Sequence, residues 1–326
     1  MTTSLVTGGL GFLGGHLVRE LRSRGERVRV LDDASGSPLA RATELADDAG
    51  IEVEVGSVLD PEALDRALRG VDRVFHLAAI VGVARLARDP VAALERNLAG
   101  AEAVVEASCR EGARLLYASS SEIYGDGAGR GAFAEDDAPG FDTARVAVDG
   151  RAAYAAAKWL GERAVRAARS RGLRAVIVRP FNAVGERQSE ESGAIVPAFA
   201  GAALRGEPIV VHGDGSATRS FGDAREIARA FADLLACDAA DGFAVNVGGE
   251  DVRTVRSVAE TVRALAGSRS PIVTGAALPV SAILHRRPDL ARLRGLLGRA
   301  PSSPIDDALA RAVAAARVPG RALAVA

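Results

Sequence analysis

Short apolar runs alternate with longer amphipathic stretches along most of this chain. The runs are brief, rich in Val, Leu and Ile, and end at small or acidic residues, which is typical of buried strands, whereas the longer stretches repeat apolar positions every three or four residues as helices do. The predicted strands are 5–7, 27–31, 51–55, 73–77, 114–118, 174–179 and 243–247. The predicted helices are 15–24, 61–68, 90–111, 151–169 and 223–236.

Strands that alternate with helices of this length predict an α/β fold of the Rossmann type, a doubly wound parallel sheet with right-handed crossovers. The simple alternation stops after residue 179, and the chain beyond residue 270 contains Pro271, Pro279, Pro288, Pro301 and Pro304. We therefore expect a smaller, discontinuous C-terminal lobe for substrate. The predicted division is 1–178 with 219–248 for the main domain and 179–218 with 249–326 for the lobe.

Three glycines at three-residue intervals, Gly8, Gly11 and Gly14, join the first strand to the first helix. In such a setting the backbone N–H groups and the helix N-terminus can face a pyrophosphate that side chains would block. The next strand ends at Asp32, where a carboxylate can accept hydrogen bonds from an adenosine ribose and repel a 2′-phosphate. A tight turn and a solvated acid would be the simpler explanations, but together the two features predict binding of NAD rather than NADP.

Tyr154 and Lys158 lie four residues apart in an Ala-rich predicted helix, so both side chains share one face. Lys158 is the only lysine among 41 basic residues. An ammonium beside a phenol favours the phenolate, so we expect Lys158 to lower the pKa of Tyr154 toward neutrality, where the phenol can act as acid and base. The pattern alone is weak, because an exposed helix lysine near a tyrosine would look the same.

The composition narrows the choice of partners. The net charge is −1 with dispersed charges, which argues against nucleic acid. Cys109 and Cys237 lack metal-ligand spacing with the four histidines, so we expect no metal site. No apolar stretch approaches 18 residues and no basic segment precedes an apolar run at the N-terminus, which favours a soluble cytoplasmic protein and no membrane partner.

Taken together, these motifs resemble the extended short-chain dehydrogenase/reductases that use NAD to modify nucleotide sugars. The resemblance covers essentially the whole chain and rests on the joint order of many pieces. The matching pieces are 7–14, Asp32, 76–79, Asn97 with Gly100, 119–125, Tyr154 with Lys158, 179–185, 213–215 with Arg219, and 286–289.

The resemblance implies roles for named residues. Tyr154 would remove the proton of the sugar 4-hydroxyl, Lys158 would also bind the nicotinamide ribose, and Ser120 would hydrogen-bond the same hydroxyl. The implied NAD-binding residues are Gly8, Gly11, Phe12, Leu13, Asp32, Val58, Leu77, Ala78, Ala79, Asn97, Ser119, Tyr154, Lys158 and Phe181. The implied nucleotide-sugar residues are Ser121, Asn182, Val196, His212, Arg219 and Arg286.

The fate of the resulting 4-ketone distinguishes the reactions in this family. Glu122 and Arg286 resemble residues of the UDP-glucuronic acid decarboxylases, in which the ketone makes a C6 carboxylate a β-keto acid that loses CO2. The segments 81–83 and 180–188 instead resemble UDP-sugar 4-epimerases, the first alternative, ahead of 4,6-dehydratases. For Glu122 and Arg286 the simpler roles are a turn cap and a phosphate contact.

Two further expectations follow from the resemblance. A non-catalytic NAD-sensing protein of the same fold is disfavoured, because such proteins usually lose the tyrosine or the lysine. The Ala-rich helices 97–111 and 151–169 are expected to pair with a second subunit as a four-helix bundle, which predicts a homodimer.

Overall fold

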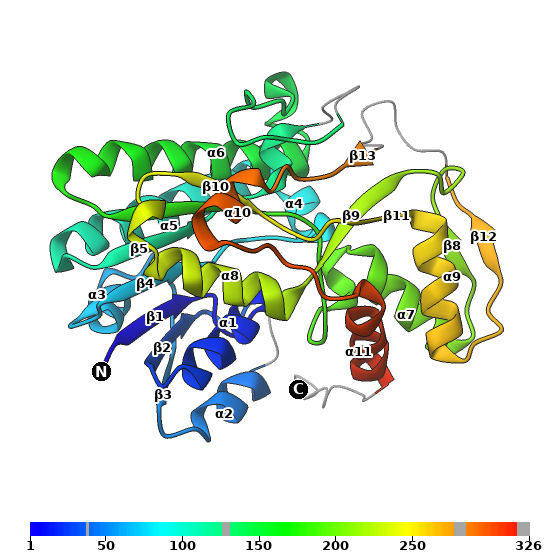
Figure 1. The fold of residues 1–326 in the computed structure, drawn as a ribbon, viewed down its shortest axis with the longest axis horizontal. Helices are drawn as coiled ribbons and strands as arrows, with labels where there is room; N and C mark the ends of the chain where they lie inside the picture. The colour runs from blue at the N-terminus through cyan, green and yellow to red at the C-terminus, as the bar shows by residue number, and fades with distance from the viewer. Residues whose placement is uncertain (37–38, 126–130, 277–284, 318–326) are drawn as a thin grey trace.

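Seven parallel strands form the central sheet, in the order β10-β6-β5-β4-β1-β2-β3 (Figure 1). The computed structural model describes residues 1–36, 39–125, 131–276 and 285–317. The strands are β1 (Thr3–Thr7), β2 (Arg27–Asp32), β3 (Ile51–Val55), β4 (Arg73–His76), β5 (Arg114–Ala118), β6 (Ala175–Pro180) and β10 (Ala244–Val247). The strand order reverses between β1 and β4, so the predicted doubly wound parallel sheet is confirmed.

Helices cover both faces of this sheet because successive strand residues point to opposite sides. In β1, Val6 packs into the core with α1 and α8, whereas Leu5 packs into the core with α3 and α5. The helices of the first face are α1 (Phe12–Ser23), α2 (Ala40–Ala46) and α8 (Ala224–Ala236). Those of the second are α3 (Pro61–Leu68), α5 (Pro90–Glu111) and α6 (Gly150–Ala168).

Some boundaries differ from the sequence-based expectation. Helix α1 begins at Phe12 rather than residue 15, because Gly14 and Gly15 are accommodated in its first turns. Before residue 179 the prediction lacked α2 and α4 (Val83–Arg88), which are too short for a clear period. It also assigned no helix to the four described helices that follow residue 179 and are not α8. The described residues also form short 3₁₀ turns. They are η1 (Ser121–Tyr124), η2 (Thr143–Arg145), η3 (Arg169–Arg171), η4 (Glu190–Ser192) and η5 (Asp238–Ala240).

A smaller lobe stands beside the carboxyl ends of the strands (Figure 1). It contains a four-stranded sheet in which β9 (Thr218–Asp223) pairs with β7 (Ala183–Val184), β11 (Asp251–Thr254) and β13 (His285–Arg286). A two-stranded sheet joins β8 (Ile209–Val211) to β12 (Ile272–Thr274). Its helices are α7 (Ile195–Arg205), α9 (Val255–Ala266) and α11 (Ile305–Arg317), which share one apolar core.

The chain crosses between the two parts several times. After β13 it returns to the main domain, where α10 (Ala291–Leu297) and its neighbour Leu290 pack against the first core. Because of this return, the division at residues 179, 219 and 249 stays a prediction. No helix in the described part of the chain has the length and apolar character needed to cross a membrane.

Candidate active site

The glycine turn brings the backbone close to the start of α1. Gly8 has a φ of +75°, and a Cβ there would lie 2.7 Å from the Ala78 nitrogen. A Cβ at Gly14 would lie 2.0 Å from the Gly8 oxygen. Gly11 is the N-cap of α1 and no side chain caps this helix. The turn therefore suits a pyrophosphate at the helix N-terminus, next to Phe12 and Leu13.

Asp32 ends β2 beside this turn. Its Oδ2 accepts a hydrogen bond from the Leu10 N–H at 3.0 Å and its Oδ1 accepts one from the Ala34 N–H at 2.9 Å. Burial raises the pKa of Asp32, an effect that the two backbone hydrogen bonds oppose. Each carboxylate oxygen retains a further lone pair, so the group can still accept hydrogen bonds from ribose hydroxyls.

The loop after β4 forms the next part of the cofactor edge. Leu77, Ala78 and Ala79 are half-buried there. The buried Asn97 side chain accepts from the Ile80 N–H at 2.7 Å and donates to the Ile80 carbonyl at 3.0 Å. Asn97 therefore holds this loop in place.

Three other residues at this edge have packing roles. His76 is buried, contacts Thr7 Oγ1 at 2.8 Å through Nδ1, and has its pKa lowered to about 3 by burial and by Lys158. Val58 is half-buried against the second core, near Gly100. A Cβ at Gly100 would lie 3.1 Å from Val58 Cγ2, so the glycine makes room for it.

Lys158 lies deep beneath the carboxyl ends of β5 and β6. Asp149 caps the start of α6, and Ala-rich packing of this helix against α5 buries Lys158 until only 3% of it is exposed. Its Nζ donates to the Ala118 carbonyl at 2.8 Å and lies 5.7 Å from the centre of the Tyr154 ring. Burial lowers the pKa of Lys158 to about 8.

The pKa of Tyr154 differs from the expectation. Burial and the charge of Glu122 raise it above its ordinary value, and only a hydrogen bond with Ser120 opposes them. The expected lowering by Lys158 is therefore wrong for the protein by itself, because desolvation of the phenolate dominates. The structure does bring Tyr154 and Ser120 together as predicted.

Glu122 and Arg286 form an ion pair across 164 residues of sequence. Arg286 Nη1 donates to Oε1 at 2.6 Å and Nη2 donates to Oε2 at 3.1 Å. Arg151 Nη2 also contacts both oxygens, at 3.2 and 3.0 Å. Burial would raise the pKa of Glu122, but Arg286 and Arg151 outweigh it and hold the pKa at about 2.

Glu122 does not act as the cap of its own turn, since Ser120 Oγ accepts the Glu122 N–H at 3.1 Å. Arg151, which sequence reasoning did not assign, lies one turn before Tyr154 on α6. The three-residue spacing from Tyr154 was the signal that could have identified it.

A third arginine, Arg219, lies beside Arg286 and Arg151. In the small sheet, Arg219 of β9 is in register with Arg286 of β13. Burial lowers the pKa of Arg219 to about 10, with further lowering by Arg286 and Arg151. The site thus collects three guanidinium groups around one carboxylate.

The other predicted residues have more varied surroundings. Asn182 Nδ2 donates to the Ser220 carbonyl at 2.9 Å, which ties it to β9. Val196 is 1% exposed in the core of the smaller lobe, so its side chain is occupied by packing. His212 is exposed just after β8, and Ser121 is buried at the start of η1.

Two predicted cofactor residues are buried at strand ends. Ser119 donates its N–H to the Val178 carbonyl at 2.8 Å, and Phe181 donates its N–H to the Val247 carbonyl at 2.8 Å. The Ser119 hydroxyl has no hydrogen-bond partner among the described residues. Both belong to the carboxyl edge of the sheet.

A buried polar network, which sequence reasoning did not predict, holds η1 in place. Arg179 donates to both oxygens of Glu162, at 2.8 and 2.7 Å, and to the Tyr124 hydroxyl at 2.8 Å. The Tyr124 hydroxyl donates to Asn246 Oδ1 at 2.7 Å. This network links β6, α6, η1 and β10, so the turn that carries Glu122 is held from two sides.

Comparison with known proteins agrees with this geometry. Residues 4–248 match the NAD dependent epimerase/dehydratase family. Among curated proteins, the chain is 33% identical to the UDP-N-acetyl-alpha-D-glucosaminuronate decarboxylase of Bacillus cytotoxicus, over 89% of this chain and 90% of that protein. It is 29% identical to UDP-glucuronic acid decarboxylase 1 of Danio rerio, over 95% and 71% respectively.

Solved structures are similar along nearly the whole chain. A UDP-glucose 4-epimerase from Thermotoga maritima, solved with UDP-glucose, has a TM-score of 0.86 at 25% identity and covers 97% of this chain and 99% of its own. A dTDP-glucose 4,6-dehydratase from Streptomyces venezuelae, solved with NAD, has a TM-score of 0.86 at 27% identity and covers 97% of each chain.

These matches confirm the predicted fold, the NAD cofactor and the class of NAD-dependent nucleotide-sugar enzymes. The individual roles of the site residues stay predictions. The chain belongs to the NAD dependent epimerase/dehydratase family.

Proposed function

We propose that the protein is a decarboxylase of a UDP-uronic acid, which oxidises the sugar at C4 before C6 leaves as CO2. The observation that carries the proposal is the ion pair between Arg286 and Glu122 beside Tyr154. The decarboxylase names of the two curated relatives support it.

The charge of the site favours an anionic sugar. Arg151 and Arg286 share the one carboxylate of Glu122 in a partly buried place, and Arg219 lies near them. A carboxylate is costly to desolvate unless a cation meets it, and a guanidinium fork matches its two oxygens. In our proposal Arg286 receives the C6 carboxylate and Arg219 contacts the diphosphate.

The first chemical task is proton removal from the 4-hydroxyl. Bound NAD supplies the hydride acceptor for C4. Tyr154 takes the hydroxyl proton, with Ser120 hydrogen-bonded to the same oxygen and Lys158 holding the ribose beside it. The raised pKa of free Tyr154 means that this proton transfer depends on positive charge brought near the phenol in the complex.

The 4-ketone then permits loss of CO2. The C5–C6 bond breaks, and its electron pair becomes an enolate whose charge lies on O4. Tyr154 and Ser120, already placed around O4, stabilise this oxyanion by hydrogen bonds. A proton from solvent water then adds to C5 and gives the 4-keto pentose. This ketone is either released or reduced at C4 by the hydride removed in the first step.

Glu122 serves in this proposal as a positioning residue. With a pKa of about 2 it is ionised at neutral pH, so it holds no proton to give to C5. Its contacts with Arg286 and Arg151 instead orient the cation that meets the substrate.

The main alternative is a UDP-sugar 4-epimerase, favoured by the similarity in structure to the Thermotoga maritima epimerase. A 4,6-dehydratase comes next. A non-catalytic NAD sensor is disfavoured, because Tyr154, Lys158 and Ser120 are all retained at one site.

Mass analysis separates these reactions. The protein is incubated with NAD and, in turn, with UDP-glucuronate, UDP-N-acetylglucosaminuronate, UDP-glucose and dTDP-glucose. Loss of CO2 from either uronate supports the proposal, and the Tyr154→Phe variant is the negative control. Conversion of UDP-glucuronate to its C4 epimer without release of CO2, or loss of water from dTDP-glucose alone, would contradict it.

We also propose a homodimer formed through α5 and α6, and a cytoplasmic location. Both cysteines, Cys109 and Cys237, are free thiols, which agrees with a reducing compartment.

A further inference from the structure

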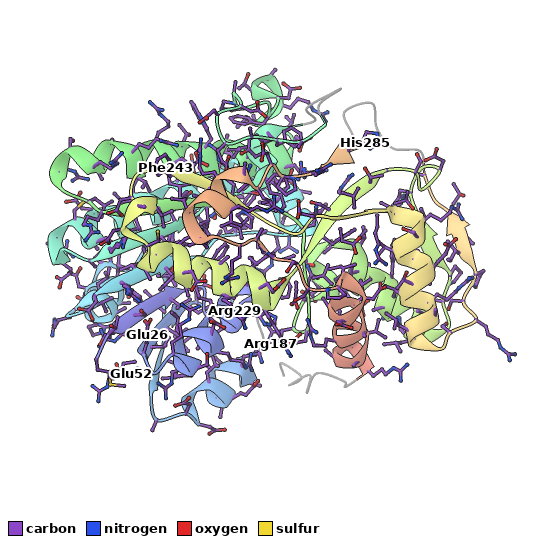
Figure 2. The ribbon with its side chains drawn as sticks, in the orientation of Figure 1. Glu26, Glu52, Arg187, Arg229, Phe243 and His285 are labelled. Atoms are coloured by element: carbon purple, nitrogen blue, oxygen red, sulfur yellow. The ribbon has the colours of Figure 1, made fainter. Side chains whose placement is uncertain are left out.

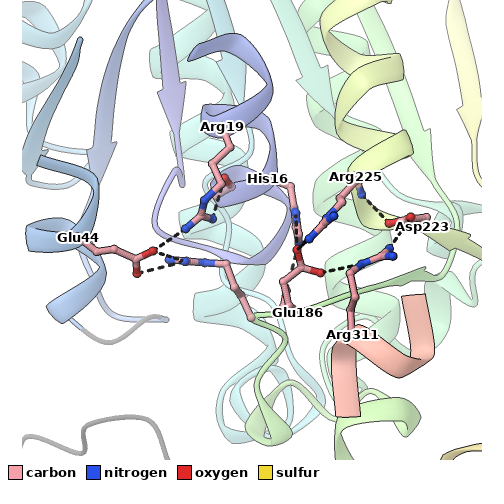
Figure 3. Close-up of polar contacts among 9 residues, drawn as sticks. His16, Arg19, Glu44, Glu186, Asp223, Arg225 and Arg311 are labelled. Atoms are coloured by element: carbon pink, nitrogen blue, oxygen red, sulfur yellow. Dashed lines mark hydrogen bonds and ion pairs between the residues drawn. The ribbon is translucent and has the colours of Figure 1, made fainter. Parts of the chain in front are cut away.

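We propose a second ligand site, an arginine pocket that binds a phosphate-bearing anion where α1, α8 and the segment after β7 meet. The cavity is about 350 Å3 and is lined by His16, Arg19, Glu186, Arg187 and Arg225. Figure 3 shows most of these side chains converging from the main domain and from the segment that leads into the smaller lobe. None of them is among the predicted catalytic, cofactor or substrate residues.

Arg187 is the residue that points to a ligand. Its Nη1 donates to both oxygens of Glu44, at 3.0 and 3.2 Å. Its Nε and Nη2 are buried and have no hydrogen-bond partner in the described part of the chain. Buried donors of a charged group seldom stay unpaired in folded proteins. The Nε–Nη2 edge is a planar fork that matches two oxygens of a phosphate group.

Two arginines on the α1 side of the pocket share one acidic partner. Arg19 Nη2 donates to the same Glu44 that Arg187 uses, at 2.6 Å, so one carboxylate serves two guanidinium groups. Arg41 Nη2 donates to the Arg187 carbonyl at 2.8 Å. Burial and then the charge of Arg187 lower the pKa of both Arg19 and Arg41. An anion among them would relieve this repulsion.

On the side of the pocket near α8 and α11, the arginines pair with acidic side chains (Figure 3). Arg225 donates through Nε and Nη2 to Glu186 Oε1, at 2.9 and 2.7 Å. Arg311 of α11 donates to Asp223 at 2.6 Å and lies 3.4 Å from Glu186. Burial lowers the pKa of His16, which therefore adds no charge at neutral pH.

The backbone holds Arg187 in an unusual conformation. Its φ is +77°, in the left-handed region that side chains other than glycine seldom adopt. A backbone strained in this way persists only where the surrounding structure holds it, and such residues cluster at functional sites. Facing it, Gly15 offers no side chain, and a Cβ there would lie 3.3 Å from Arg187 Nε. The fork is thus held toward α1 with space beside it.

The volume and the contacts indicate the class of ligand. A cavity of about 350 Å3 is within the range of small-molecule sites and exceeds the needs of a lone phosphate. Its lining is charged and has no aromatic platform apart from the His16 ring. The recognised chemistry is therefore a phosphate group, either free or carried by a small metabolite.

Titration with inorganic phosphate tests the proposal. Calorimetry and thermal unfolding are run on the NAD-loaded full-length protein, in sodium phosphate against sodium chloride of equal ionic strength. We expect saturable binding and a higher unfolding midpoint, with affinity reduced at least about tenfold in Arg187→Gln. The matched control is Arg229→Gln, which lies apart from Arg187 (Figure 2). Arg229 is one turn beyond Arg225 on α8 and does not line the pocket, so this variant should bind phosphate as wild type does.

Two results would overturn the proposal. One is phosphate binding that is equal in wild type and Arg187→Gln. The other is binding that disappears in Arg286→Ala but survives in Arg187→Gln, which would assign the anion to the candidate active site. If Arg187→Gln does not fold, Arg19→Gln and Arg225→Gln, whose side chains are 44% and 56% exposed, replace it.

A parallel titration with AMP distinguishes the sources of phosphate. Tighter binding of AMP than of phosphate, lost in Arg19→Gln, indicates a phosphorylated metabolite. Binding of phosphate alone, with the same dependence on Arg19, indicates the free anion.

Discussion

Replacing Tyr154 with Phe removes one phenolic oxygen that lies beside Glu122 and is hydrogen-bonded to Ser120. We expect turnover to fall by at least about 10²–10⁴-fold, because the proton of the 4-hydroxyl then has no acceptor at the right place. The unfolding midpoint should change little. Absorbance of NADH in a single turnover measures the loss, and near-normal turnover would remove Tyr154 from the mechanism.

If the Lys158 ammonium holds NAD, the affinity for NAD should depend on the ionisation of this group and therefore on pH. Its pKa is about 8, so the charged donor predominates below that pH and is lost above it. We expect the Kd for NAD to rise as the pH increases from 7 to 9.5. Lys158→Met should bind NAD more weakly and show a flat profile over this range. If the Kd for NAD changes with pH in the same way in wild type and in Lys158→Met, the ammonium does not hold the cofactor.

The ionisation of Glu122 should make the free energy of unfolding depend on pH. Its folded pKa of about 2 lies below its ordinary 4.5, so its stabilising contribution is present above pH 4.5 and is lost as the pH falls through 2. Glu122→Gln should reduce the free energy of unfolding at pH 7 by about 2–3 kcal/mol, since Arg286 also loses its partner. Denaturant unfolding from pH 7 to 3 should show the difference narrowing below pH 4.5.

The control for this experiment is Glu62→Gln, a solvent-exposed acid on α3. It should leave stability nearly unchanged at every pH. A Glu122→Gln difference that is constant with pH would mean that ionisation of Glu122 is not the cause.

At the scale of elements, the glycine turn permits a paired test of α1. Gly14→Ala puts a Cβ 2.0 Å from the Gly8 oxygen and 2.9 Å from the Gly9 Cα, both of them backbone atoms. We expect a loss of about 3 kcal/mol in the free energy of unfolding and a loss of NAD binding. Gly295→Ala in α10 meets nothing within 4 Å and should stabilise the protein by about 0.5–1 kcal/mol. Unfolding curves of both variants test whether the two changes in the free energy of unfolding have opposite signs, and NAD titrations test the loss of binding.

The sheet of the main domain could be predicted because its central strands are buried on both faces and read as continuous apolar runs. Elements that depend on distant partners could not. β9 carries Thr218, Arg219 and Ser220 in succession, and it becomes a strand only by pairing with β7, β11 and β13. Its polar side chains gave no strand signal.

The same distinction holds for the site. Tyr154 and Lys158 follow from spacing along one helix, whereas the contact of Glu122 with Arg286 depends on β13 taking its place beside β9. Family resemblance assigned both residues to the site but did not predict their contact. The raised pKa of Tyr154 was missed because spacing reports a neighbouring charge and not the desolvation that a fold imposes.

At the scale of the whole molecule, α5 and α6 pack against each other (Figure 1). We expect this pair of helices to form the surface that binds a second subunit. The two helices keep partly exposed leucines, Leu94 and Leu98 on α5 and Leu160 on α6. We expect light scattering to give the mass of a dimer, and the double variant Leu98→Glu with Leu160→Glu to give a monomer because buried charge opposes association. A wild-type mass equal to one chain at all concentrations would contradict the prediction.

Lys158 also makes the protein unusually easy to follow by chemistry. It is the only lysine, so apart from the chain terminus the molecule offers a single amine to acylating or reductively methylating reagents. That amine is buried and has a pKa of about 8, so it becomes nucleophilic at mild alkaline pH only when the site admits the reagent. An isotope-labelled methyl group on Lys158 would give a single side-chain resonance that reports ionisation and cofactor occupancy, because the arginine side chains do not react with the reagent.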